Sequence, residues 1–244
     1  MQSAVKTTDN TSPINLLAAQ TAAELSMSST DATNRPSTAG DDFGDNRWAD
    51  VHQLYVLESH EREPDVLFVG DSHVALLEQS EVYHEQFEPL HCLCFGILYD
   101  TTENLLWRVQ NGELQSIKPK VVVLSIGTFD KGSVDETCER LKQIVDVIQD
   151  RQPKAQIFVL KLLPTGRQPN ARRNFVQAVN DHIDRLFEQN EKVQPLSMDA
   201  GFVAADGTID RHDMFDFCHL SREGYRKAFD LVFTAVNSVL STDA

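Results

Sequence analysis

Five short apolar runs, each separated from the next by a helical pattern, constrain the fold of this chain more than any other feature. The runs span residues 65–69, 91–95, 121–126, 156–160 and 193–198. None of them alternates strictly between apolar and polar residues, which is typical of strands covered on both faces. Repeated strand–helix units favour right-handed crossovers and a parallel sheet. The sequence therefore predicts a three-layer α/β/α fold with a five-stranded, doubly wound parallel sheet.

Apolar stripes at helical spacing predict the helices that cover this sheet. One helix over residues 47–60 precedes the first strand, and others span 135–149, 172–188 and 221–240. In the helix over residues 135–149, the apolar residues that share one stripe are Leu141, Ile144, Val145 and Ile148. Ser221 suits the N-cap of the last helix. Ligands of such sheets bind at the carboxyl ends of the strands, so chemistry is expected in the loops that follow them.

The N-terminal segment differs in composition from the rest of the chain. Residues 1–42 are rich in Ser, Thr, Asn, Asp and Ala. Such a segment buries too little apolar surface to offset its chain entropy, so we expect a disordered tail. A short helix around residues 14–25 is the alternative for part of it. We expect residues 43–241 to form the α/β domain.

Charge and cysteine content limit the partners and the compartment. Lys and Arg number 22 against 37 Asp and Glu, a formal charge of −15, which disfavours nucleic acid and anionic lipid surfaces. No run approaches the roughly 18 apolar residues of a membrane helix, and no basic region precedes the apolar cluster at residues 16–19. The four cysteines lack a metal-ligand spacing and are expected to be buried free thiols. They are Cys92, Cys94, Cys138 and Cys218. We expect a cytoplasmic protein without a metal or a transmembrane segment.

A Gly70-Asp71-Ser72 sequence follows the first strand directly. Gly70 would allow a tight turn, and Ser72 would begin the next helix. The free N–H groups at a helix N-terminus favour developing negative charge. Taken alone, the sequence is more typical of a turn that ends in an N-capping serine.

The second chemical feature is a carboxylate three residues before a histidine. Asp216 can reach the Nδ1–H of His219, which leaves Nε2 free to act as a base toward a serine. The alternative is a capping Asp beside a surface His, and His212 and Asp213 are equally available for the pair. The pair lies just before the last predicted helix, and its occurrence together with Gly-Asp-Ser at a strand end predicts a Ser72–Asp216–His219 catalytic set.

These blocks resemble those of a known family of esterases. The ordered blocks Gly70-Asp71-Ser72, Gly96, Gly127-Thr128 and Asp216-x-x-His219 are similar to those of the SGNH (GDSL) hydrolases, which have a flavodoxin-like fold. Longer segments resemble the catalytic (alpha) subunits of cytosolic platelet-activating-factor acetylhydrolase type Ib. Those segments are residues 64–72, Leu106-Trp107-Arg108, residues 111–114, Leu162-Leu163-Pro164 and residues 212–216. The resemblance covers roughly residues 45–240.

The resemblance implies a serine esterase that uses no cofactor and no metal. In the family, the serine attacks the acetyl ester of an ether phospholipid, the histidine acts as base and the aspartate orients it. The oxyanion is held by the serine N–H, by the N–H of a glycine after the second strand and by an asparagine side chain after the third. The subunits form homodimers or heterodimers with a sister subunit and bind the WD-repeat lissencephaly protein.

Four positions depart from the family pattern. Phe129 stands where the family has the oxyanion asparagine, and Tyr99 stands where it has the oxyanion glycine. Loss of one such donor costs about 10²–10³ in rate. His73 replaces an apolar residue after the serine, and Cys218 replaces a leucine before the histidine. His73 has two interpretations, a residue that lines a changed acyl pocket or a substitute donor to the oxyanion.

Two functions therefore compete. The first is a subunit with reduced or absent esterase activity that acts through its dimer and the WD-repeat partner. The second is an active esterase that removes the acetyl group from platelet-activating factor or a related ether phospholipid. The intact triad favours the second and the altered oxyanion positions favour the first. A nucleotide-binding module is a weaker third, because no phosphate-binding glycine loop is present.

Overall fold

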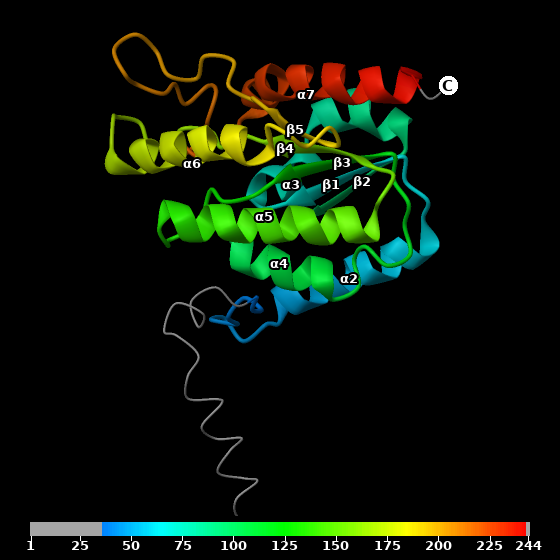
Figure 1. The fold of residues 1–244 in the computed structure, drawn as a ribbon. Helices are drawn as coiled ribbons and strands as arrows, with labels where there is room; N and C mark the ends of the chain where they lie inside the picture. Colours follow the sequence, from blue (N-terminus) through cyan, green and yellow to red (C-terminus); the bar gives the residue numbers. More distant parts are fainter. Residues whose placement is uncertain (1–35, 243–244) are drawn as a thin grey trace, which may run out of the picture. The chain divides into compact units, whose positions relative to one another are not determined.

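The computed structural model describes residues 36–242 and contains the predicted parallel sheet. All five strands are parallel, in the order β2-β1-β3-β4-β5 (Figure 1). Their bounds lie within two residues of the predicted runs, at β1 (Val66–Gly70), β2 (Cys92–Gly96), β3 (Val121–Ser125), β4 (Gln156–Leu160) and β5 (Val193–Leu196). The strand order reverses at β1, so the crevice beyond the carboxyl ends of β1 and β3 is where such a fold holds a ligand.

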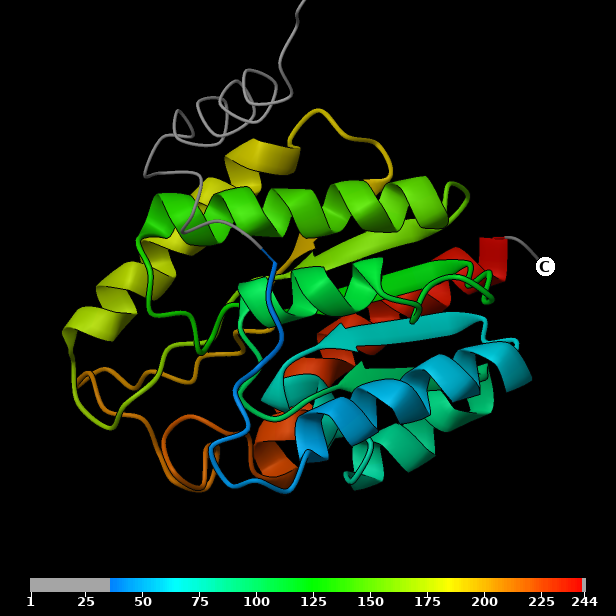
Figure 2. The ribbon, with the colours of Figure 1, turned by 90° about the horizontal axis from the view of Figure 1, so that it is seen from below.

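Helices cover both faces of the sheet and complete the three layers. One face carries α2 (Arg47–Glu61), α4 (Thr102–Gln110), α5 (Val134–Arg151) and α6 (Ala171–Phe187). The other carries α3 (Ser72–Leu77), a π turn η1 (Tyr83–Phe87), a 3₁₀ turn η2 (Glu88–Leu90) and α7 (Arg222–Thr242). Figure 2 shows α2 in blue and α5 in green running alongside the strands, with the orange loops before α7 at the arrowhead end of the sheet.

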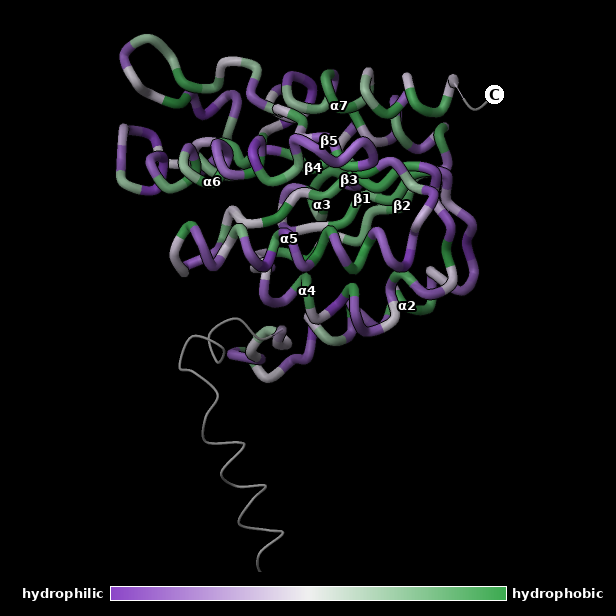
Figure 3. Tube along the Cα trace, viewed as in Figure 1, coloured by the Kyte–Doolittle hydropathy of each residue, from purple (hydrophilic) through white to green (hydrophobic). Residues whose placement is uncertain are grey.

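Alternating strand residues supply the two apolar cores. On β1, Leu67 and Val69 face the α5 side while Val66 and Phe68 face the α7 side, and all four are fully buried. Figure 3 shows the hydrophobic colour concentrated along the central strands. The predicted stripe of α5 is confirmed, because all four of its residues are buried in the first core. Ser221 caps α7 as predicted, its Oγ accepting the Gly224 N–H at 3.1 Å.

Helix α4 was not predicted as an element. A reciprocal capping box defines its start, in which the Thr101 hydroxyl accepts the N–H of Asn104 and the Asn104 side chain accepts the Thr101 N–H. The helix is only nine residues long, and it carries the buried Arg108 on its inward side. An arginine at this position indicates a surface residue and interrupts the apolar stripe of the helix. The sequence pattern therefore did not predict α4.

Two strand-end glycines allow the elements around Ser72 to pack closely. A Cβ on Gly70 would lie 1.9 Å from the Ser125 carbonyl oxygen of β3, and one on Gly96 would lie 2.2 Å from the Ala75 nitrogen of α3. Neither glycine has a positive φ. The expectation that Gly70 serves a tight turn is therefore replaced by a steric reason, the close approach of neighbouring backbone.

Arg108 crosses the interior beneath the carboxyl ends of β1 and β2. Its side chain is fully buried, and its Nη2 donates to the Gly70 carbonyl at 2.9 Å while both terminal nitrogens lie 3.3 Å from the Phe95 carbonyl oxygen. Its Nε donates to Asp100 and its Nη1 to Glu113, each at 2.8 Å. Burial raises the pKa of Asp100 to about 6, against the pull of Arg108 and the hydrogen bond from the Trp48 indole.

Residues 36–42 form the described end of the segment that we expect to be disordered. Ser37 donates its N–H to the Glu103 carbonyl at 3.4 Å and its hydroxyl to the Glu103 carboxylate at 2.5 Å. The remainder of that segment, and the helix considered around residues 14–25, lie outside the described residues. Among the described helices, none has the length and apolar character needed to cross a bilayer.

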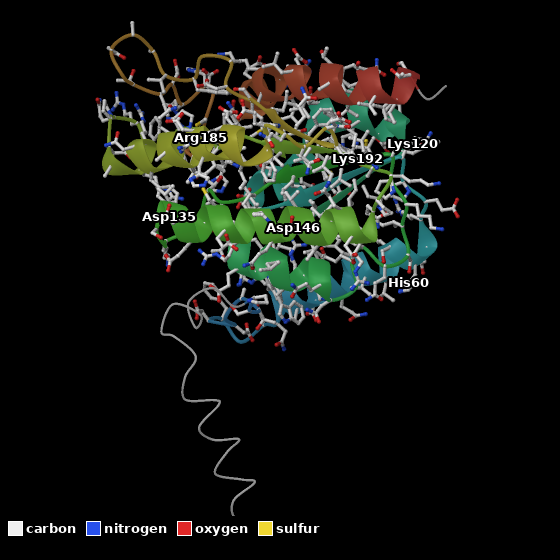
Figure 4. The ribbon with its side chains drawn as sticks, viewed as in Figure 1. His60, Lys120, Asp135, Asp146, Arg185 and Lys192 are labelled. Carbon is white, nitrogen blue, oxygen red and sulfur yellow. The ribbon has the colours of Figure 1, made fainter. Side chains whose placement is uncertain are left out.

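Replacing Arg108 by methionine is expected to lower the free energy of unfolding by about 3–5 kcal/mol, because Asp100 then remains buried without a cation. Urea denaturation at pH 8 and pH 5 measures the loss, which should be smaller at pH 5, because the pKa of Asp100 is raised to about 6 and protonation removes its buried charge. Arg185, on the exposed surface of α6 (Figure 4), provides the control. Arg185→Met should change stability by less than about 0.5 kcal/mol. Equal losses for the two variants would contradict the structural role of Arg108.

Candidate active site

Ser72 lies at the first position of α3, directly after β1. The side chain of Asp71 caps the helix by accepting the His73 N–H at 3.0 Å. Ser72 is fully buried, and its Oγ accepts a hydrogen bond from the backbone N–H of Tyr99 at 2.8 Å. A backbone donor from the loop after β2 is therefore directed at the predicted nucleophile.

Asp216 and His219 form a bonded pair on the loop before α7. His219 Nδ1 lies 2.6 Å from Asp216 Oδ2, and Asp216 Oδ1 accepts the N–H groups of Cys218 and His219 at 3.0 and 2.7 Å. Although partial burial opposes the shift, the His219 ring and these two backbone donors hold the pKa of Asp216 below its ordinary value. The carboxylate thus orients the ring with Nδ1 protonated and Nε2 as the basic nitrogen.

The two alternative members of the pair have other partners. His212 Nδ1 lies 2.9 Å from Asp210 Oδ1, on the exposed surface. Asp213 accepts a hydrogen bond from Lys227 of α7 at 2.5 Å. Neither residue contacts His219 through an ion pair or a side-chain hydrogen bond.

His219 Nε2 is buried and has no hydrogen-bond partner among residues 36–242. Ser72 Oγ is accordingly not bonded to it in this conformation. Catalytic hydrogen bonds are often long in unliganded enzymes and tighten when substrate binds. The missing Ser72–His219 hydrogen bond therefore does not exclude the predicted pair.

Three aromatic side chains, Tyr99, Phe129 and Phe215, surround the His219 ring, and we refer to them as the aromatic cluster. Phe129 and Phe215 stack on His219 at centroid distances of 5.7 and 5.8 Å, with interplanar angles of 25° and 17°. The Tyr99 ring packs edge-on against two other rings, that of His219 at a centroid distance of 5.7 Å and that of Phe129 at 5.2 Å. Aromatic rings on three sides hold the His219 ring in one orientation. The cluster also shields His219 from water.

Tyr99 and Phe129, the two residues predicted to stand at oxyanion positions, present different groups to Ser72 and His219. Tyr99 adopts a left-handed conformation with φ of 63°, the region that glycine occupies readily and tyrosine rarely. Its N–H consequently points toward Ser72 as a glycine N–H would. Phe129 places an apolar ring against His219 and has no side-chain donor.

Arg172 of α6 fixes the loop that carries Phe129. Its guanidinium donates to the backbone carbonyls of Gly127, Thr128 and Asp130 at 2.8–2.9 Å. It also stacks over the Phe175 ring at 4.0 Å. Sequence reasoning missed this residue because a single arginine near a helix start carries no pattern that points to a loop 44 residues away.

His73 points away from the oxyanion position. Its ring is buried, and Nε2 lies 3.2 Å from the carbonyl oxygen of Cys218. The interpretation of His73 as a substitute oxyanion donor is therefore not supported, because the nitrogen that would serve is directed at the backbone. Cys218 is half-buried, and its burial raises the thiol pKa to about 11; the other three thiols are buried.

The described residues contain no group of three or more His, Cys, Asp or Glu side chains placed to hold a metal ion. The polar groups that converge on this edge of the sheet are a buried hydroxyl, an oriented imidazole and a backbone N–H. That set is suited to acyl transfer through a serine nucleophile.

Comparison with known proteins agrees with this chemistry. The model of the GDSL-like lipase/acylhydrolase family matches residues 68–227. The chain belongs to this family. It is 48% identical over 193 residues to human platelet-activating factor acetylhydrolase IB subunit alpha2, covering 79% of this chain and 84% of the relative. To the human subunit alpha1 it is 40% identical over 211 residues, covering 86% and 91%.

The fold is shared with solved GDSL hydrolases of low sequence identity. A GDSL-like lipase from Bacteroides thetaiotaomicron superposes with a TM-score of 0.66 at 17% identity, covering 77% of this chain and 97% of that protein. The predicted flavodoxin-like SGNH hydrolase architecture is confirmed. The sequence resemblance to the acetylhydrolase Ib alpha subunits is confirmed as well.

Asp216→Asn is expected to slow the covalent labelling of Ser72 by an organophosphonate probe by about 10²–10⁴, because an amide in place of the carboxylate no longer selects the reactive tautomer of His219. Mass spectrometry of the labelled peptide measures the rate. Asp210→Asn serves as the matched control, since Asp210 is an exposed partner of His212. Equal labelling rates in both variants would exclude Asp216 as the orienting carboxylate.

Proposed function

We propose that this GDSL-family chain is a serine carboxylic-ester hydrolase of the acetylhydrolase Ib lineage whose rate of hydrolysis is reduced. The observation that carries the proposal is the unequal state of its oxyanion donors. The Tyr99 N–H is directed at Ser72, whereas the position of the third donor carries the ring of Phe129. A nucleophile, a base and backbone donors support acyl transfer, and a missing donor limits its rate.

The magnitude of the limitation follows from the chemistry of the tetrahedral intermediate. One side-chain oxyanion donor is worth about 10²–10³ in rate. In comparable enzymes, the catalytic groups that remain after one is lost still give a rate that exceeds the uncatalysed rate by orders of magnitude. Slow turnover is therefore the expected outcome, rather than the high rate of an esterase with three donors.

A short acyl group on an apolar or cationic alcohol is the substrate class that this site favours. Ser72 is fully buried, so little room surrounds the acyl carbon. The rim above it exposes Leu98, Tyr99 and Phe215, with 49%, 63% and 52% of their surface accessible. Alkyl chains and quaternary ammonium groups both bind such surfaces. The two curated relatives are named for an acetylhydrolase of platelet-activating factor, so the acetyl ester of an ether phospholipid is the first candidate.

The names of the relatives also support a role as a subunit. Both are designated subunits of one acetylhydrolase, so we infer that this chain forms a homodimer or pairs with a sister subunit in the cytoplasm. Together with the WD-repeat lissencephaly protein expected from the family, this gives a binding role that does not need turnover.

Co-purification from cells separates the binding role from the esterase role. Recovery of the WD-repeat protein with a Ser72→Ala variant supports the binding role, and its absence from wild-type preparations contradicts it.

Hydrolysis of an acetyl ester by the purified protein is expected to be slow and to disappear in Ser72→Ala. Release of acetate from platelet-activating factor and from 4-nitrophenyl acetate measures it, with organophosphonate labelling of Ser72 as a second readout. A rate that is unchanged in Ser72→Ala would show that Ser72 is not the nucleophile. A wild-type rate equal to that of the curated relatives would contradict the reduced activity.

Phe129→Asn is expected to raise kcat for acetyl-ester hydrolysis by up to about 10²–10³, because it restores a side-chain donor at the oxyanion. Phe129→Leu is the matched control, since it removes the ring and supplies no donor. A rise in both variants would show that the bulk of the ring, and not the missing donor, limits the rate. Tyr99 needs no replacement for this test, because its backbone donor is already in place.

A further inference from the structure

His73 makes two contacts that the proposed triad chemistry does not use. Nε2 lies 3.2 Å from the Cys218 carbonyl oxygen, and Nδ1 lies 3.5 Å from Asp71 Oδ1. Both His73 and Asp71 are buried, with exposures of 1% and 0%. The Asp71 contact is an ion pair only where His73 is protonated.

The two contacts of the His73 ring differ in kind. Nε2 lies within hydrogen-bond distance of the Cys218 carbonyl oxygen, and a carbonyl oxygen only accepts, so Nε2 carries a proton and donates it. Nδ1 makes no hydrogen bond among residues 36–242, although it lies 3.5 Å from Asp71 Oδ1. Burial lowers the pKa of His73, but Asp71, the Cys218 carbonyl and the more distant Asp216 outweigh it and raise the pKa above the ordinary value. The link from His73 to the second loop is therefore the hydrogen bond from Nε2.

The Cys218 carbonyl belongs to the peptide group that joins Cys218 to His219. The N–H of the same peptide group donates to Asp216 Oδ1 at 2.7 Å. This peptide plane is consequently held at its oxygen by His73 and at its nitrogen by Asp216. A third link closes the arrangement, because the Tyr225 hydroxyl of α7 donates to the His73 carbonyl at 2.8 Å.

We propose that His73, through the hydrogen bond from its Nε2 to the Cys218 carbonyl, is a positioning residue that fixes the backbone of His219 relative to Ser72. The inference rests on the proposed esterase function for its kinetic consequence. It joins two segments 145 residues apart in the sequence, the start of α3 and the loop before α7. The groups that face His73 are Asp71 on its own loop, Cys218, His219 and Asp216 on the second loop, and the Tyr225 hydroxyl from α7.

His73→Leu and His73→Gln together test the positioning role, because leucine removes the donor to the Cys218 carbonyl and the glutamine amide supplies one again. We expect the rate at which an organophosphonate labels Ser72 at neutral pH to fall about tenfold or more in His73→Leu, since small misplacement of a reacting group has large effects. We expect His73→Gln to recover most of that rate. An unaltered rate in His73→Leu, or an equal loss in both variants, would overturn the proposal.

One measurement does not depend on esterase activity. Amide exchange of His219 should accelerate in His73→Leu and remain slow in His73→Gln and in the wild type; equal protection in the three proteins would also overturn the proposal. If Ser72 is unreactive in the wild type, the proposed function fails while amide exchange still decides the role of His73.

Discussion

The buried guanidinium of Arg108 is the interaction on which the arrangement of the site depends. It donates to the carbonyls of Gly70 and Phe95, which lie at the carboxyl ends of β1 and β2. Gly70 leads directly into Asp71 and Ser72, and the loop after β2 returns to the same cation through Asp100. One buried charge therefore fixes the starting points of the two loops that bring Ser72 and the Tyr99 N–H together. Since a buried cation must keep its partners, these loops have little freedom to separate.

Close packing at two glycines brings the two loops that Arg108 holds near each other. Any side chain at Gly70 would collide with the backbone of β3, and any side chain at Gly96 would collide with the first turn of α3. The glycines therefore allow α3 to sit directly on the end of β2. The Tyr99 N–H reaches Ser72 Oγ at 2.8 Å as a result of this approach. The fold supplies this donor through backbone geometry, and the identity of the side chain at position 99 is secondary to it.

Those parts of the molecule that depend on local pattern could be predicted from the sequence. The strands follow from apolar runs and α5 from its stripe, and the Asp216–His219 pair follows from a three-residue spacing that a loop can close. Arg108 and α4 were missed because burial of an arginine depends on carboxylates that only the fold brings together. The contacts of Phe215 and Arg172 arise from tertiary packing, for which the sequence offers no periodic signal. The left-handed backbone of Tyr99 likewise has no local signal in the sequence, because tyrosine rarely adopts that conformation.

The positions that depart from the family pattern are grouped around His219 and differ in effect. Every residue except proline has a backbone N–H, so position 99 keeps one once tyrosine tolerates the left-handed backbone. A side-chain donor exists only in some residues, and phenylalanine at position 129 has none. Both rings also contact His219 and each other, so the two replacements form one packed surface. Two departures of equal size in sequence therefore differ in chemistry, because position 99 retains its backbone donor and position 129 has no side-chain donor.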